Sequence, residues 1–327
     1  MLKKELDKPF MPIDEQINQL KNDRRLLFQS EELAKKELIR YGYYEIINGY
    51  KEHFMVDESD DSKGFKDNVT FDHIFALFNL DTQLRKEVMA CLELFEANLR
   101  QVLSYTVAEQ ISDNQDGYLK RYHYNTGRKF YNKRKKKYCY PIDSLLNKLK
   151  RTTKSNNEPF KHYRDEHDNI PPWIIVKDIS FGNLIWWFRL LKRNEKHLVI
   201  SRMMNLPLEF IDNDISRMVG SILDIYLNYR NTAAHGGRIY NHKSSKHKLP
   251  YIEILHKQLN VNPAMYRQGY GQSRFGTLLK TLSLFENQEP YLQLCSGVKI
   301  VISRYLKLYP QDKKYLIKKM ELELLDK

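Results

Sequence analysis

The chain has few cysteines, no apolar run long enough to span a membrane, and no acidic cluster of the kind that holds a catalytic metal ion. Its three cysteines, Cys91, Cys139 and Cys295, form no C-x-x-C pair, which argues against a disulfide framework and against a zinc site. The first residues, MLKKELDKPF, lack the apolar segment of a secretory signal. We therefore expect a cytoplasmic protein with no membrane span, metal or cofactor.

Basic residues are in clear excess over acidic ones. Lysine and arginine number 54 against 41 aspartates and glutamates, which gives a formal net charge of +13 and a pI near 9.3. This excess favours a polyanionic partner, and nucleic acid is a better candidate than a membrane because no spanning segment is present. A length of 327 residues is sufficient to bury a large core as one domain or as two closely packed ones.

Two segments have the three-to-four residue spacing of apolar side chains that is typical of amphipathic helices. Residues 70–111 keep this spacing without a proline or glycine, which corresponds to about 60 Å if the helix is unbroken. A second stripe runs from Ile215 through Tyr229 to Ala233. We expect the two segments to pack as the central antiparallel pair of an all-α helical bundle.

The pattern divides the chain into three regions. These are an N-terminal helical region (1–69), a helical core (70–245) with a basic insertion at 113–170, and a C-terminal helical region (246–327). The end of the insertion, up to Ile170, is rich in Asn and is expected to be irregular. The next segment, through Phe188, contains all three tryptophans, a density of apolar bulk that favours the core over a subunit contact.

Polar residues gather where the second helix is expected to end. Arg230, Asn231 and His235 come together there, and Gly236-Gly237 can adopt the left-handed conformation that closes many helices. An arginine stays charged and can hold two phosphate oxygens, while a histidine titrates near neutral pH and can move a proton. The set suits phosphodiester cleavage, in which Arg230 stabilises charge, His235 transfers the proton and Asn231 orients His235 or the phosphate.

The helical geometry of this motif points to a second chain. On a helix with about 100° per residue, Arg230 and His235 lie roughly 140° apart, whereas Asn231 and His235 share a face. A site that uses all three side chains needs either a distorted helix end or a second copy of the motif from a symmetry-related chain. We favour the second copy and therefore expect a homodimer.

The motif Arg230-Asn231-x-x-x-His235 resembles the R-x-x-x-x-H signature of HEPN-domain ribonucleases. Together with its flanking segments the chain resembles the Abi-like (abortive infection) family over about residues 8–241. The matching segments are KPFMPIDEQINQLK from Lys8, YGYYEIINGY from Tyr41, TFDHIFALFNLDTQLRKEVMACLELFEANLR from Thr70, PPWIIVKDISFGNL from Pro171 and RNTAAHGGRIYN from Arg230.

The resemblance implies a HEPN-like bundle that acts as a metal-independent endoribonuclease of a phage-defence or toxin-antitoxin system. It also implies control by an antitoxin or by a bound small RNA. The sequence departs from the family pattern at one place: relatives often carry a second histidine after the first, and this chain has Gly236. The departure leaves His235 as the only local proton carrier and bears on the rate of the reaction.

The resemblance also suggests residues outside the motif. In the family a Glu and an Arg recur on the long helix, which implies that Arg100, four residues after Glu96, reaches the active-site groove. A surface ion pair of Glu96 with Arg100 is the alternative. Arg238 and Tyr240 continue the family pattern after the histidine, and we expect them to contact RNA.

A basic and aromatic run lies between the two long helical segments. Residues 118–140, YLKRYHYNTGRKFYNKRKKKYCY, interleave cationic and aromatic side chains. Cations follow a phosphate backbone and aromatic rings stack on unpaired bases, so the pattern favours RNA binding over a plain solvated loop. The residues expected to contact RNA here are Arg128, Lys129, Lys133, Arg134, Lys135, Lys136 and Lys137.

Two further functions remain open from the sequence. The first is a non-catalytic RNA-binding module of a defence ribonucleoprotein, because Arg and His at a helix end can also cap carbonyl groups and pair with acids. The second is DNA cleavage, which the lack of an acidic metal-binding cluster disfavours.

Overall fold

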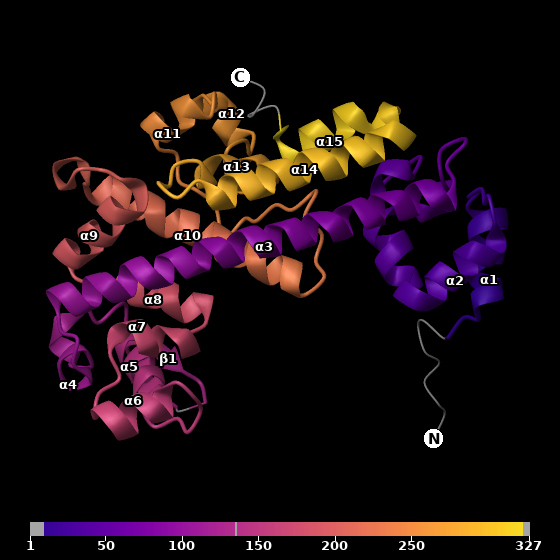
Figure 1. The fold of residues 1–327 in the computed structure, drawn as a ribbon. Helices are drawn as coiled ribbons and strands as arrows, with labels where there is room; N and C mark the ends of the chain where they lie inside the picture. The colour runs from indigo at the N-terminus through magenta and orange to yellow at the C-terminus, as the bar shows by residue number, and fades with distance from the viewer. Residues whose placement is uncertain (1–9, 135, 323–327) are drawn as a thin grey trace. The chain divides into compact units, whose positions relative to one another are not determined.

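The computed structural model describes residues 10–134 and 136–322. This part of the chain is built from helices, and its strands are the two of one short hairpin (Figure 1). The predicted all-α class is confirmed. The chain divides into two compact units: the first holds the residues up to Arg85 together with Val298–Lys314, and the second holds Lys86–Gly297 and the residues from Tyr315 onward.

Long-range polar contacts join segments of the first unit that are far apart in sequence. The buried carboxylate of Asp312 accepts hydrogen bonds from Nε2 of His73 at 2.7 Å, Nε2 of His53 at 3.0 Å, and the hydroxyl of Tyr305. The ring of His73 also stacks on Tyr309 with 3.8 Å between centroids. The α-helices described in this unit are α1 (Ile13–Asn18), α2 (Glu31–Tyr41), the start of α3 (Phe71–Gln110), the end of α14 (Glu289–Leu308) and the first residues of α15 (Lys313–Met320), alongside short π- and 3-10 helices.

The long helix α3 has almost the bounds expected from the sequence, Phe71–Gln110 against residues 70–111. Its apolar stripe is buried throughout, from Leu77 through Val88 and Phe95 to Val107. Ser30 caps the start of α2, since its Oγ accepts from the backbone N–H of Leu33 at 3.3 Å. Spacing and caps therefore fix these two helices locally.

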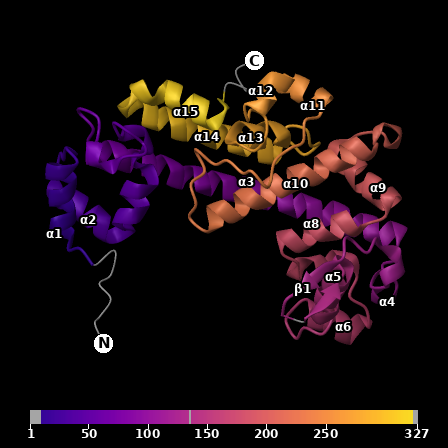
Figure 2. The same cartoon turned by 180° about the vertical axis from the view of Figure 1, so that it is seen from behind.

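The second unit is centred on α10 (Asn213–Ala234), which crosses α3 (Figures 1 and 2). Asp212 caps the start of α10 by accepting from the N–H of Ile215 at 2.8 Å. The ring of Tyr226 packs edge-on against Phe95 of α3, with 4.8 Å between centroids. Three other helices contact α10: α8 (Phe181–Leu190), α9 (Arg193–Met204) and α13 (Phe275–Leu282).

The basic insertion is folded. An antiparallel hairpin pairs Tyr131 with Tyr138, and a helix forms over the segment that was expected to be irregular. That expectation was wrong: residues 160–167 form a helix that buries Phe160 and is closed by Asp168 in the left-handed conformation. The elements here are α4 (Gln115–Tyr118), β1 (Phe130–Asn132), β2 (Lys137–Cys139), α5 (Pro141–Thr152), α6 (Phe160–His167) and α7 (Pro172–Ile175).

The C-terminal residues also fold as helices, and their sequence is shared between the two units. Besides α13 and α14, they form α11 (Glu253–Gln258), α12 (Pro263–Arg267) and α15 (Lys313–Met320). Among the helices described, none combines the length and the apolar character that a membrane crossing requires.

Candidate functional site

The C-terminal end of the motif helix α10 is set by the two glycines that follow it, Gly236 and Gly237. Gly236 has a φ of +75°, and the N–H groups of Gly236 and Gly237 donate to the carbonyls of Ala233 at 3.3 Å and Thr232 at 2.8 Å. This pair of bonds is a Schellman closure, which requires a residue in the left-handed region. His235 is the residue at which the helix ends, and its side chain is exposed. The imidazole is thus held at the helix end and faces solvent.

Arg230 lines an open cavity of about 450 Å³ beside the second half of α3. The cavity also contains the side chains of Arg100, Glu93 and Glu96, with Met89 at its edge. Two guanidinium groups and two carboxylates therefore face one space. Such a cavity can bind an anion through the arginines, with the glutamates limiting how much negative charge it accepts.

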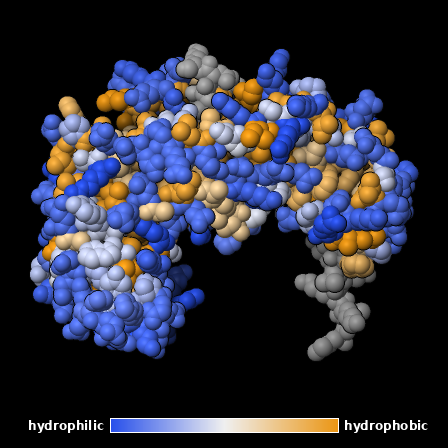
Figure 3. All heavy atoms as spheres, viewed as in Figure 1, coloured by the Kyte–Doolittle hydropathy of each residue, from blue (hydrophilic) through white to orange (hydrophobic). Residues whose placement is uncertain are grey.

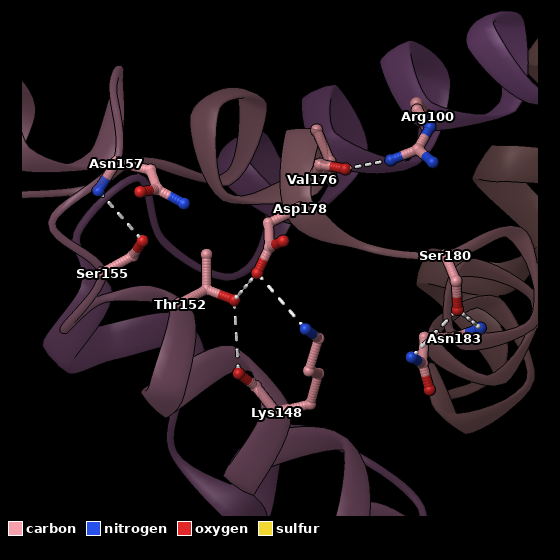
Figure 4. Close-up of polar contacts among 9 residues, drawn as sticks. All are labelled: Arg100, Lys148, Thr152, Ser155, Asn157, Val176, Asp178, Ser180 and Asn183. Carbon is pink, nitrogen blue, oxygen red and sulfur yellow. Dashed lines mark hydrogen bonds and ion pairs between the residues drawn. The ribbon is translucent and has the colours of Figure 1, made fainter.

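Arg100 lines the same cavity as Arg230, and its guanidinium has a partner on each side. Its guanidinium donates to the carboxylate of Glu96 and to the backbone carbonyl of Val176 (Figure 4). The Arg100 side chain is 23% exposed and that of Glu96 is 14% exposed. The pair is therefore a half-buried part of the groove, and the alternative of a purely surface ion pair does not fit these positions.

The turn that Arg100 holds is also fixed to α5. Asp178, two residues after Val176, accepts from Thr152 Oγ1 at 2.7 Å, and Lys148 Nζ lies 3.3 Å from the same carboxylate oxygen (Figure 4). The hydrogen bond from Thr152, with help from Lys148, lowers the pKa of Asp178. These contacts connect α3 to α5 through a single turn, so the cavity wall and the basic insertion are held together.

Asn231 and His235 do not line the cavity that Arg230 shares with Arg100. On an ideal helix, Arg230 and His235 lie on opposite flanks of α10. Of these two residues, only Arg230 lines the cavity. The Oδ1 atom of Asn231 accepts a long hydrogen bond of 3.4 Å from Arg230 Nη1. Within the described residues, Asn231 meets His235 through its backbone carbonyl, at 3.0 Å from the His235 nitrogen. Within one chain, therefore, the side chains of Arg230, Asn231 and His235 do not meet at a single site.

A second histidine next to α10 was not identified from the sequence. Nε2 of His242 lies 2.7 Å from Oδ1 of Asn228, and the His242 ring packs against Tyr229. Asn228 is seven residues before His235, so the two share one flank of the helix about two turns apart. No spacing rule could have found His242, because its position depends on how the loop after Gly237 returns to the helix.

The remaining expected RNA-contact residues divide by exposure. The cations of the hairpin are exposed, and Lys129 Nζ lies 4.7 Å from the centre of the Tyr138 ring. Arg238 is also exposed, whereas Tyr240 is fully buried with its hydroxyl 3.3 Å from that of Tyr315. The RNA contact expected of Tyr240 does not fit this burial. Lys135 lies outside the described residues. The other cations expected to contact RNA in the run, all exposed, are Arg128, Lys129, Lys133, Arg134, Lys136 and Lys137.

Comparison with known families now adds to this geometry. The family model described as Abi-like protein matches residues 36–241, which is more than half of the chain. The chain belongs to the Abi-like protein family. No curated protein and no solved structure matches it.

The Abi-like match includes the residues of the candidate site and stops just after them. Its last residue, 241, directly precedes His242, and it covers Arg100, Arg230 and His235. The segment from Lys8, which was thought to share the resemblance, lies before the matched residues. The C-terminal helices from α11 onward lie after them.

Proposed function

We propose that this Abi-like protein is a metal-independent HEPN-type endoribonuclease that acts in phage defence. Membership of the Abi-like family associates the chain with abortive infection. The observation that best supports the enzyme is the placement of Arg230 and Arg100 in one cavity on one side of α10, with His235 exposed where that helix ends. A fixed pair of cations and a titratable ring are the groups that transesterification at phosphorus requires.

In the proposed reaction the ribose 2′-oxygen attacks the adjacent phosphorus and the 5′-oxygen leaves. His235 transfers the proton, and Arg230 stabilises the charge that develops on the phosphorane oxygens. Asn231, which accepts from Arg230, positions that guanidinium or the phosphate. The products are a 2′,3′-cyclic phosphate, or the 3′-phosphate formed from it, and a 5′-hydroxyl end. RNA is the substrate because DNA lacks the attacking 2′-oxygen.

The proposed site is completed by a second chain. In one copy, Arg230 lines the cavity on one flank of α10, and His235 belongs to the other flank. A twofold axis near the end of α10 would bring His235 of one copy toward Arg230 of the other, so we propose a homodimer. Control by an antitoxin or by a small RNA held on the basic hairpin is part of the same proposal, since a toxic nuclease must be kept silent.

The decisive test is cleavage of a labelled single-stranded RNA by the purified full chain in the presence of EDTA. We expect cleavage with cyclic-phosphate ends, and at least about a hundredfold loss in His235→Ala. His162→Ala, which alters an exposed histidine on α6, is the matched control and should cleave normally. Cleavage that requires a divalent metal, or that survives in His235→Ala, would remove the mechanism.

A non-catalytic RNA-binding module is the second candidate. It is favoured by the glutamates in the cavity and by the bonds that hold Arg100 within the protein. Both candidates bind RNA in a salt-dependent way, but only the enzyme turns it over. Binding without turnover in the EDTA experiment would select the module.

A further inference from the structure

A second basic surface, separate from the hairpin tip, lies between α4 and α5 in the second unit. Two cavities of about 680 and 310 Å³ open there, and Leu119, Lys120 and Lys150 line both of them. Because they share these side chains, the two cavities form one continuous groove, named here the α4–α5 groove. Its other cations are Arg121 in the larger cavity and Lys154 in the smaller one.

The charge of the α4–α5 groove is positive but partly balanced. Asp143 in the larger cavity accepts from Nε of Arg121 at 2.9 Å, and Asp116 lines the smaller cavity. Four cations against two carboxylates leave a net positive lining. The carboxylate of Asp143 also fixes the direction of Arg121, whose guanidinium lies 5.3 Å from the centre of the Tyr140 ring. An oriented guanidinium binds a phosphate at a lower entropic cost than a mobile one.

The groove also offers an aromatic face. Tyr122 lines the larger cavity and is 65% exposed, with its ring centre 4.1 Å from that of His123. An exposed tyrosine has no role in the core of the fold, while stacking on an unpaired base is worth about 1–3 kcal/mol. Asn147 adds an amide to the same cavity. Cations, an amide and an exposed ring along one groove are the features of a site for single-stranded nucleic acid.

The groove is continuous in the chain with the basic hairpin. Strand β2 ends at Cys139, and α5 begins at Pro141. Between them lies Tyr140, whose ring contacts the guanidinium of Arg121. The face of the molecule over α5, α6 and β1 is hydrophilic almost throughout (Figure 3). From Asp143 to Lys150 the groove follows α5 for about 10 Å, and Lys154, just past the end of that helix, extends its lining. This length accommodates a few nucleotides of an extended strand.

We propose that the α4–α5 groove binds the backbone of single-stranded RNA, with Lys120 and Lys150 on the phosphates and Tyr122 stacked on a base. The identity of the strand as RNA rests on the proposed function. The phosphate and stacking contacts themselves do not depend on the proposed function. The groove holds the strand while the hairpin cations bind its continuation, and the contacts from α5 through Asp178 to Arg100 fix this platform relative to the cavity.

The test measures binding of fluorescently labelled oligouridine to full-length protein in a His235→Ala background, where no cleavage interferes. We expect the pair Lys120→Ala and Lys150→Ala to weaken binding at least about tenfold and to reduce the slope of log affinity against log salt by about 1.4. The control pair, Lys161→Ala and Lys257→Ala, removes two exposed lysines that line neither cavity and should leave both quantities unchanged. Equal binding by the two pairs would overturn the proposal.

A second measurement needs no groove substitution and covers the case in which the double variant misfolds. Oligouridine that contains 4-thiouridine is crosslinked to the His235→Ala protein, and the crosslinked peptides are identified by mass spectrometry. We expect crosslinks at Tyr122, and their absence from both Leu119–Tyr122 and Asp143–Lys154 would overturn the proposal. Tighter binding of the matching DNA oligomer than of RNA would overturn the assignment to RNA.

The outcomes separate this proposal from the nuclease. If the parent protein binds RNA through the groove but does not cleave it, the groove proposal stands and the nuclease proposal fails. A parent that cleaves, together with groove variants that bind and cleave normally, leaves the nuclease and removes the groove.

Discussion

His242 Nε2 lies 2.7 Å from Oδ1 of Asn228 on the motif helix, and its ring packs edge-on against Tyr229 at 4.6 Å between centroids. An amide oxygen can only accept, so Nε2 carries the ring proton and Nδ1 carries the lone pair. Burial lowers the pKa of His242. The ring is therefore neutral at physiological pH and is a fixed structural neighbour of α10.

This relationship predicts a pH-dependent contribution to stability. The folded-state pKa of His242 is below its ordinary value of about 6.5, so as pH falls through that value the unfolded chain takes up a proton that the folded chain does not. The stability that neutral His242 contributes is therefore fully present above about pH 6.5 and is lost as the pH falls below this value. We expect His242→Gln to lower the free energy of unfolding by about 1 kcal/mol at about pH 7.5, and by less at about pH 5.5.

Urea unfolding at the two pH values measures this difference, with His162→Gln on α6 as the control because that ring is exposed. The control should change stability by less than about 0.5 kcal/mol at either pH. A loss for His242→Gln that is the same at both pH values would contradict a ring that is held neutral in the folded state.

Arg100→Lys is expected to destabilise the protein although it keeps the charge. A lysine is a single point of charge and cannot reach both the Glu96 carboxylate and the Val176 carbonyl that the guanidinium joins. We expect a loss of about 1–3 kcal/mol in the free energy of unfolding. Arg217→Lys is the control, since Arg217 pairs with Asp214 on α10 while both side chains remain about two-thirds exposed. Similar losses in the two variants would refute the anchoring role.

Mixing two inactive variants tests the shared site. If Arg230 of one copy works with His235 of the other, a dimer of one Arg230→Ala chain and one His235→Ala chain retains one intact site. Random pairing makes half of the dimers mixed, so we expect about a quarter of the parent RNA cleavage after unfolding and refolding the two together. Cleavage no higher than that of the separate variants would show that each chain uses its own pair.

Asp312 is expected to be essential for the first unit. Burial alone would raise its pKa, but the hydrogen bonds from His53, His73 and Tyr305 outweigh burial and hold the pKa well below its usual range. The stability from this carboxylate is present above the ordinary aspartate pKa of about 4 and is lost as pH falls through its lower folded-state value. We expect Asp312→Asn to cost about 3 kcal/mol at neutral pH, because it leaves buried partners poorly matched.

Thermal unfolding monitored by circular dichroism measures the Asp312→Asn change. Asp23→Asn is the control, because Asp23 is an exposed aspartate of the same unit. A loss for Asp312→Asn no larger than that of the control would mean that the three donors bind water equally well in its place.

The sequence predicted what depends on local spacing and missed what depends on distant segments. The bounds of α3 and the burial of the α10 stripe follow from periodicity alone. Apolar density could not say which face of α8 is buried: Trp187 is in the core, but Trp186 is 44% exposed. Of the three tryptophans in residues 171–188, the prediction of burial in the core was therefore correct for Trp187 alone, since Trp173 is 42% exposed as well.

The candidate site shows the same division. The opposite directions of Arg230 and His235 followed from 100° per residue, because one regular helix carries both. Spacing within α3 gives no information about what faces Arg100, so periodicity could not predict that Arg100 and Arg230 line one cavity. The contacts of His242 with Asn228 and of Tyr240 with Tyr315 depend on loops and helices that close from elsewhere in the chain. No local pattern encodes such contacts.

The hairpin described above is anchored at its base and exposed at its tip. The hydroxyl of Tyr124 donates to the carbonyl of Tyr118, and that of Tyr118 donates to Ile170, both from buried positions. Changes of length or charge at the tip therefore leave these buried bonds and the motif helix intact. Under the proposed function, changes at the tip would alter which RNA the hairpin holds without altering the residues proposed to cut it, so exchanging tips between homologues would show whether the hairpin sets the target.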